Sequence, residues 1–304
     1  MNRVDVVGLG YNSVDYLCRI PFFPRPNIKM NALEFSKQGG GQVATALVAL
    51  SRWNVTTAYI GKAGDDECGH FVRKSLEKEN IDTSGLILKK GAKTQTAFIL
   101  VPEKDGERTI FWKRDTKGNL STRDFKKPSV IRGRILHVDG HEIDAAVQAA
   151  KWASAKGMHT VFDAEKVFPG TEKLIRLTHS LVCSEEFPKI FTGTGNKREA
   201  LKQLKKLGPH YVVVTLGKKG ALGYDGKSFV RVQGHKVHTV DTTGAGDVFH
   251  AGFIFGLLKR WSLEKTMHFA NIAAALKCRA LGGRSGIPSI PEISSTLNKS
   301  GCSL

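Results

Sequence analysis

Residues 240–253, VDTTGAGDVFHAGF, place three small residues directly before an acid and an apolar stretch. The small residues are Gly244, Ala245 and Gly246, and the acid is Asp247. A helix that begins near Ala245 leaves several backbone N–H groups unpaired at the positive end of its dipole. Glycines let an anion approach these groups closely. We therefore expect the N–H groups to hold a transferring phosphoryl group while Asp247 accepts the proton of an attacking hydroxyl.

Asp247 also has a simpler explanation. An acid in the first turn of a helix is favourable on electrostatic grounds alone. The run of small residues before it, and Asp241 six residues earlier, favour the chemical explanation.

Two other phosphate-binding motifs are incomplete. The segment that ends in Gly226-Lys227-Ser228 has Ala221 where a P-loop needs its first glycine, and its context is a hairpin. The stretch GLGYNS, at 8–13, has Ser13 where a dinucleotide fingerprint has its third glycine. Phosphate binding is therefore predicted at 240–253.

Apolar runs alternate with helical patterns along most of the chain. Strands are predicted at 4–10, 55–61, 134–140, 159–164, 180–184 and 211–217, and helices at 43–53, 67–80, 142–156, 197–207, 245–259 and about 263–281, followed by a loop. Continuous apolar strands separated by helices are typical of parallel sheets covered on both faces, with ligands at the carboxyl ends. We predict an α/β fold with a doubly wound, mostly parallel sheet.

Two segments break this alternation. Residues 30–37 and 94–113 have strand patterns without intervening helices, and the second is predicted to be a hairpin that turns at 104–106. We expect a small β-sheet lid, formed by segments about 12–36 and 94–114, on a single α/β domain spanning 1–304.

Composition narrows the class of protein. The chain has 304 residues, 41% of them hydrophobic, and no run of 18 apolar residues, which argues against a membrane span. No signal peptide is expected, and the scattered cysteines lack a CxxC pair, which favours reduced thiols in the cytoplasm. The net charge of +18 raises nucleic-acid binding, but the basic residues are spread along the chain. We favour a basic enzyme, whose surface would attract phosphorylated or acidic small molecules.

The motif DTTGAGD before an apolar helix resembles the C-terminal signature of the ribokinase/PfkB carbohydrate kinase family. GGGQVATALVALSRW at 39–53 is similar to the N-terminal signature, and 61–86 and 211–226 are similar to further family blocks. The resemblance runs from Val4 to about Pro288. It implies a ribokinase-like fold and transfer of the γ-phosphoryl group of ATP to a sugar hydroxyl, with Mg²⁺ and often a monovalent cation such as K⁺.

The resemblance also implies roles for individual residues. Asp247 would be the catalytic base, with the N–H groups of 244–246 around the phosphoryl group. The substrate side would comprise Asp15, Gly40, Gly41, Gln42, Thr45, Arg114 and Asp139. The nucleotide side would comprise Ser184, Thr215, Gly217, Gly244, Gly246, Asn271 and Ala274. Asp241 and Thr243 resemble the monovalent-cation loop. Two alternatives stay open, since Asp15 could be an exposed loop residue and Arg114 a surface arginine.

Departures from the family pattern bear on the substrate. Thr45 stands where the N-terminal signature usually has Asn, and Phe187 ends SEEF where the family's Asn-x-x-Glu motif has Glu. Ketohexokinase and the sulfofructose kinases depart similarly at the position of Phe187, and the tail ALKCRALGGRSGIP resembles the latter. We therefore expect a ketose substrate, fructose or a fructose derivative. Ribose, a nucleoside or 2-keto-3-deoxygluconate remain alternatives, as does a non-catalytic sugar or nucleotide sensor. Lids of this family often pair between subunits, which implies a homodimer.

Overall fold

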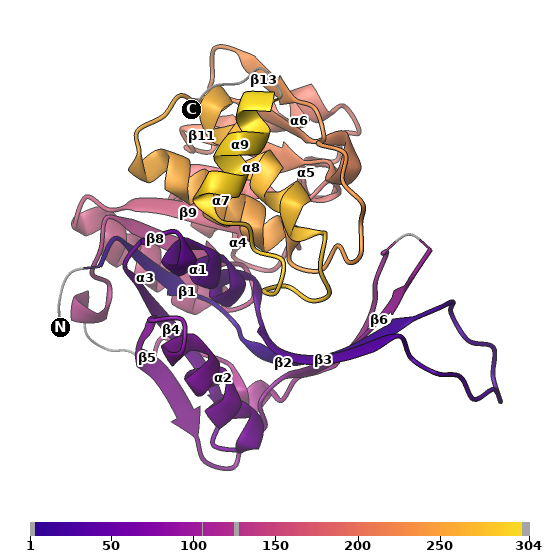
Figure 1. Cartoon of the computed structure of the whole chain (residues 1–304). Helices are drawn as coiled ribbons and strands as arrows, with labels where there is room; N and C mark the ends of the chain where they lie inside the picture. The colour runs from indigo at the N-terminus through magenta and orange to yellow at the C-terminus, as the bar shows by residue number, and fades with distance from the viewer. Residues whose placement is uncertain (1–3, 105, 125–127, 300–304) are drawn as a thin grey trace.

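The computed structural model describes residues 4–104, 106–124 and 128–299 (Figure 1). Cys302 and the centre of the turn predicted at 104–106 lie outside these ranges. No helix within them is both long enough and apolar enough to cross a lipid bilayer.

Within the described ranges the main sheet has nine strands, in the order β13-β12-β11-β10-β9-β8-β1-β4-β5. Seven are parallel: β1 (Val6–Leu9), β4 (Thr57–Gly64), β5 (Asp82–Lys89), β8 (Ile135–Asp139), β9 (His159–Ala164), β10 (Ser180–Cys183) and β11 (Tyr211–Thr215). The antiparallel strands β12 (Ala221–Tyr224) and β13 (Phe229–Val232) complete one edge. The mostly parallel sheet predicted from the sequence is confirmed.

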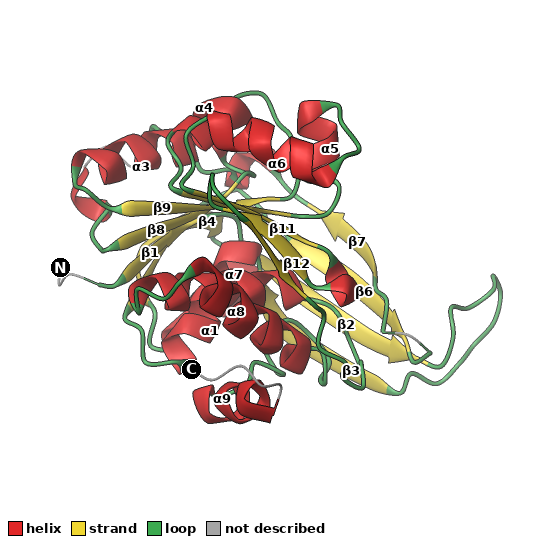
Figure 2. Ribbon diagram, turned by 90° about the horizontal axis from the view of Figure 1, so that it is seen from above, coloured by secondary structure: helices red, strands yellow, loops and turns green. Residues whose placement is uncertain are grey.

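Helices cover both faces of this sheet (Figure 2). One face carries α1 (Gln42–Arg52), α2 (Glu67–Glu77), α7 (Ala245–Leu258), α8 (Leu263–Lys277) and α9 (Ile290–Lys299). The other carries α3 (Ile143–Ala155), α4 (Thr171–Arg176), α5 (Phe187–Thr192) and α6 (Lys197–Lys206). Short 3₁₀ turns lie at η1 (Thr116–Gly118), η2 (Pro128–Val130) and η3 (Gly217–Lys219).

The apolar strand sequences follow from this layering. Every residue of β1, β8 and β10 is buried, because each strand packs against helices on both sides. Leu47 and Leu50 of α1 fill the core on one face, and Phe162 of β9 fills the core on the other. Fully burying one such side chain contributes about 1.5–3 kcal/mol to folding, so an alanine at Phe162 would cost several times a typical surface substitution.

A second sheet, in the order β3-β2-β6-β7, projects from the body as an arm (Figure 1). Its strands are β2 (Ser13–Ile20), β3 (Glu34–Gly40), β6 (Thr96–Pro102) and β7 (Thr109–Lys113). In-register partners point to the same face. Leu17 and Ile99 therefore share the inner face, which packs on Leu281, whereas Phe98 and Phe111 share the outer face.

Several predicted elements differ from the observed ones. The strand predicted at 30–37 lies at 34–40, and the helix predicted to reach about 281 ends at Lys277. The sequence analysis did not identify β2, β5, α4, α5 or α9. The short helices have too few turns for a clear period, and α9 begins directly after the Pro-containing loop.

Candidate functional site

The carboxyl ends of the parallel strands meet at one edge of the main sheet. β1 is flanked by β4 on one side and β8 on the other, so the strand order reverses there. Ligands of open α/β sheets bind outside the carboxyl ends at such a reversal. This edge is shared by four residues at or next to the carboxyl ends of β8, β9, β10 and β11, namely Asp139, Asp163, Ser184 and Thr215.

The N-terminus of α7 reaches the same edge and exposes part of its backbone. Gly244 is the N-cap, with φ of 76°, and a Cβ there would come within 2.7 Å of Gly283. Gly246 is exposed, and a Cβ there would meet nothing within 4 Å. Ala245 donates its N–H to the Thr242 carbonyl at 3.2 Å. Among the described residues, the N–H groups of Gly244 and Gly246 have no acceptor. Of the three amides predicted to bind an anion, these two are therefore available to it, whereas the Ala245 amide is already hydrogen-bonded.

Asp247 lies half-buried in the first turn of α7. Burial raises the pKa of its carboxyl well above the ordinary 3.8, and the nearby Asp163 raises it further, whereas His250 and Arg108 oppose the shift. A carboxylate with a raised pKa beside unpaired N–H groups has the properties of a general base.

A buried polar chain that sequence analysis missed supports this turn. His250 lies with Nδ1 2.8 Å from the Gly246 carbonyl and Nε2 3.4 Å from a carboxylate oxygen of Asp163. Gln42, a predicted substrate residue, donates to the other oxygen of Asp163 at 3.2 Å. Burial raises the pKa of the Asp163 carboxyl and lowers that of His250. Asp163 could have been found as the one acid in the apolar run HTVFDA.

The predicted sugar-side residues gather where β2, β3 and α1 meet. Asp15 is half-buried in β2 and accepts from the Ser13 hydroxyl at 2.7 Å, so the exposed-loop alternative is wrong. A Cβ at Gly40 would collide with the Asp15 carboxylate. Gly41, with φ of 100°, caps α1 and packs against the backbone at 11–12, and its carbonyl accepts the N–H of the buried Thr45 at 2.8 Å.

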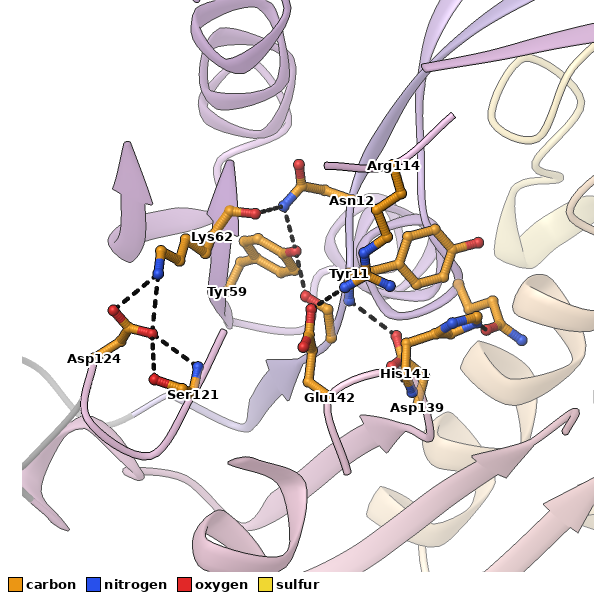
Figure 3. A network of polar contacts seen from close by, with 12 residues as sticks. Tyr11, Asn12, Tyr59, Lys62, Arg114, Ser121, Asp124, Asp139, His141 and Glu142 are labelled. Atoms are coloured by element: carbon orange, nitrogen blue, oxygen red, sulfur yellow. Dashed lines mark hydrogen bonds and ion pairs between the residues drawn. The ribbon is translucent and has the colours of Figure 1, made fainter. Parts of the chain in front are cut away.

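Arg114 is largely buried rather than a surface arginine. It forms a short ion pair with Glu142, and the two side chains are 17% and 5% exposed (Figure 3). Its guanidinium also lies 5.8 Å from the ring centre of Tyr11. Burial raises the pKa of Glu142 to about 7, against the opposing effect of Arg114.

Asp139 is fully buried and organises the loop after β1. One oxygen accepts the N–H of Tyr11 at 3.1 Å and the other that of His141 at 3.0 Å (Figure 3). Both oxygens thus bond to the protein itself, which indicates a structural role at a position predicted to bind substrate.

The predicted nucleotide residues lie along the ends of β10 and β11 and on α8. Thr215 donates to the Cys183 carbonyl at 3.3 Å, and Ser184 to the Glu165 carbonyl at 3.3 Å. Gly217 is exposed with φ of 54°, and a Cβ there would meet nothing within 4 Å. On α8, Asn271 donates to the Gln233 carbonyl at 2.8 Å, and Ala274 is half-buried one turn further on.

The predicted cation loop is bonded to the segment after α8. The buried Asp241 carboxylate accepts the N–H of Thr243 at 2.8 Å and that of Gly282 at 2.7 Å. The backbone carbonyl of Asp241 accepts a hydrogen bond from the ammonium of Lys277 at 2.9 Å. Thr243 is buried, and its hydroxyl has no partner among the described residues.

Phe187 is a core residue. It is fully buried and stacks with Phe191 at 5.8 Å, so position 187 offers no ligand to a metal. The neighbouring Glu185 pairs with Lys197 at 3.2 Å, and both side chains are about one third exposed, at 36% and 38%.

Unpaired N–H groups at a helix N-terminus, an adjacent acid and a doubly wound sheet are the features expected of a phosphotransferase of the α/β class. The family described as pfkB family carbohydrate kinase matches residues 1–290, and the chain belongs to this family. It is a phosphotransferase that acts on a sugar hydroxyl.

Individual relatives cover almost the whole chain. A probable fructokinase-5 of Arabidopsis thaliana is 29% identical over 283 residues, covering 84% of this chain and 86% of its own. A ribokinase of Staphylococcus aureus is 27% identical over 298 residues, covering 95% and 98%. Among solved structures, a putative ribokinase from Agrobacterium tumefaciens superposes with a TM-score of 0.91 at 26% identity over 98% of this chain and 99% of that one. A putative ribokinase II from E. coli, solved with ATP and Mg²⁺, has a TM-score of 0.85 at 20% identity over 97% and 99%. The last likeness concerns the fold alone, and the relatives together leave the sugar open.

Proposed function

We propose that this kinase phosphorylates a primary hydroxyl of an uncharged ketose, fructose or a close derivative. Asp247 takes the proton of the attacking hydroxyl, and the N–H groups of Gly244 and Gly246 stabilise charge on the transferring phosphoryl group. The observation that carries this proposal is the half-buried acid next to unpaired amides at the start of α7.

We take a small pocket next to Arg114, the one predicted substrate residue in its lining, as the sugar site, and its charge balance favours an uncharged substrate. This pocket is lined by Tyr11, Asn12, Lys62, Thr94 and Arg114 among others. Both of its less exposed cations are already paired, Arg114 with Glu142 and Lys62 with Asp124 at 3.0 Å. A sugar acid would need a free cation here to balance its carboxylate. The pairs leave neutral donors and acceptors, which suit hydroxyl groups, together with the more exposed Lys93 and Asp115, whose charges are of opposite sign.

We place the nucleotide, ATP, at the part of the sheet edge formed by the ends of β10 and β11 and by α8. The open space at Gly217 and Gly246 accommodates phosphate groups against the backbone. Mg²⁺ usually keeps several waters and binds to substrate phosphates with one or two carboxylates. The exposed Glu165 lies within electrostatic range of Asp247 and is our candidate for such a contact, because Phe187 has no oxygen to offer. Bound Mg²⁺ would neutralise charge that develops on the phosphates.

The four-stranded sheet is proposed to act as a lid and as a dimer interface, within a chain that works as one domain. Its loop already touches the cation loop, because Arg108 donates to the Thr242 hydroxyl at 3.1 Å. On the outer face, Phe35, Phe98 and Phe111 are 77%, 58% and 55% exposed. An apolar surface of this kind marks an interaction site, and a second copy of this chain is the occupant that we propose.

A panel of sugars assayed by coupled ADP release tests the substrate. Fructose is expected to give the highest kcat/KM, ahead of ribose, 2-keto-3-deoxygluconate and nucleosides. A preference for the sugar acid would contradict the argument from paired cations. ADP release that no sugar stimulates, combined with ligand binding by calorimetry, would favour the sensor alternative.

We propose a cytoplasmic location, consistent with the unbonded Cys18, Cys68, Cys183 and Cys278, and no nucleic-acid partner.

A further inference from the structure

Lys277, the last residue of α8, is fully buried. A lysine in the final turn of a helix usually extends into solvent, where it interacts favourably with the helix dipole. The side chain of Lys277 points inward instead. Taking an ammonium group out of water is costly unless it is paired, so its position calls for a specific interaction.

That interaction is with the loop before the proposed anion site. The ammonium donates to the Asp241 carbonyl at 2.9 Å, and no carboxylate of the described residues comes within ion-pair distance of it. Burial lowers the pKa of Lys277, while Asp241 and Asp247 oppose this shift. The charge of Lys277 therefore interacts electrostatically both with Asp241 in the loop and with the proposed base, Asp247.

The surroundings hold the two segments together. The N–H groups of Val240 and Asp241 donate to the Cys278 carbonyl at 2.8 and 3.1 Å, next to Lys277 in the chain. Gly286 packs so closely on the Lys277 carbonyl that a Cβ there would collide with it. Each oxygen of the Asp241 carboxylate already accepts one backbone N–H group, from Thr243 and from Gly282. The loop therefore presents its carbonyl to the ammonium, in the place where its sequence predicts a monovalent cation.

The buried Thr243 hydroxyl, which has no partner among the described residues, is an oxygen that a K⁺ ion could use, but the Asp241 carbonyl beside it already binds the ammonium of Lys277. A cation bound at the Asp241 carbonyl would lie beside a second positive charge in a buried setting, where repulsion is strong. We propose that Lys277 is a positioning residue that supplies, as part of the chain, the positive charge that a monovalent cation would otherwise bring to the 241–244 loop, so that catalysis does not depend on K⁺. This inference rests on the proposed role of that loop in holding the phosphoryl group.

The expected consequence is an unusual response to salt. Wild-type kcat should agree within about twofold in K⁺, Na⁺ and tetramethylammonium chloride at equal ionic strength. Lys277→Ala should lose at least about tenfold in kcat in tetramethylammonium, and K⁺ or NH₄⁺ should restore much of it, because the small side chain leaves room for an ion. K⁺ should also raise the Tm of Lys277→Ala but leave that of the wild type unchanged. Lys265→Ala, at the half-buried third residue of the same helix, where the ammonium lies 5.0 Å from the Trp261 ring centre, is the matched control and should behave as the wild type does.

The Tm measurement needs no turnover, so it decides the inference even if the substrate proposal fails. Strong activation of the wild type by K⁺ would overturn the inference, as would a Lys277→Ala variant that responds to K⁺ in neither assay. If Lys277→Ala does not fold in either salt, Lys277→Met carries the test, since it fills the space without charge. Low kcat without rescue by K⁺ supports the inference, and wild-type kcat in that variant overturns it.

Discussion

Asp163 and His250 face each other beneath the proposed catalytic turn, with Oδ1 and Nε2 3.4 Å apart and side chains 6% and 5% exposed. Nδ1 of His250 lies 2.8 Å from the Gly246 carbonyl and Nε2 lies 3.4 Å from the Val182 carbonyl; since a carbonyl can only accept, we assign the proton to Nδ1, which makes the shorter contact. His250 thereby holds the carbonyl of the residue whose N–H is proposed to face the phosphoryl group.

We predict that His250→Phe lowers kcat by about tenfold while KM for ATP changes little, because the fixed amides act mainly in the transition state. The lost hydrogen bonds should also cost about 1–3 kcal/mol in the free energy of unfolding. Steady-state kinetics and urea unfolding measure the two effects separately. A fall in stability with unchanged kcat would assign His250 to packing alone.

Asp247→Asn should lower kcat by about 10²–10⁴-fold with little effect on ATP binding. The raised pKa of Asp247 means that the folded protein favours the protonated carboxyl. Its contribution to stability is therefore full below its unfolded pKa, near 3.8, and is lost as pH rises through the folded value. At about pH 8 the Asn variant should consequently be as stable as the wild type or more so.

The same pKa sets the pH profile. Wild-type kcat/KM should rise with pH as Asp247 ionises, with a midpoint above 3.8. Asp144→Asn, an exposed first-turn acid of α3, is the control and should retain wild-type turnover. Near-normal turnover by Asp247→Asn would show that another group is the base.

Arg114→Met tests the buried ion pair. At a pH above about 7, where Glu142 is ionised, the variant leaves a buried carboxylate without its partner and should lose about 3–5 kcal/mol of stability. This loss of stability should be small at a pH below 4.5, because the raised pKa keeps Glu142 neutral in the folded protein and the carboxyl is then also mostly neutral in the unfolded chain. Urea unfolding at both pH values measures the difference.

The double variant Arg114→Met/Glu142→Gln should recover most of the loss, since no buried charge remains unpaired. If the single variant kept full stability and instead raised KM for the sugar, Arg114 would be a direct substrate contact.

The sequence predicted those features that local pattern determines. Buried parallel strands are continuous apolar runs, so the strand ends at Ser184 and Thr215 could be placed, and the small residues at 244–246 marked the helix start. Asp15 and Gly40, which the family resemblance placed together on the substrate side, lie next to each other in the structure, although β2 itself was missed.

Pairings across long stretches of sequence were beyond that analysis. Glu142 forms an ion pair with Arg114 across 28 residues of sequence, and the sequence of neither segment indicates that the two side chains meet. Lys277 has the sequence context of an exposed helix-end lysine, and only the fold of the 278–286 segment turns it inward. Asp139 stands at the end of an apolar strand, where a ligand-binding residue is expected, yet both of its carboxylate oxygens accept hydrogen bonds from backbone N–H groups.

The last prediction concerns the outer face of the arm. Tyr16, Phe98 and Phe111 are neighbours across three strands, and the rings of Tyr16 and Phe98 stack at 5.2 Å. Phe98→Glu should place a charge at the centre of the proposed dimer interface, where desolvation makes it costly, and weaken self-association by at least about tenfold. Sedimentation velocity over a range of concentrations measures the change.

Ile190→Glu on α5 is the matched control, because Ile190 is 63% exposed on a helix that covers the main sheet and does not belong to the arm, and its variant should still dimerise. If the lid closes only when two arms pair, Phe98→Glu should also raise KM for the sugar, since water then reaches the site more freely. A wild-type chain that sediments as a monomer at micromolar concentration would remove the second copy as the occupant of this face.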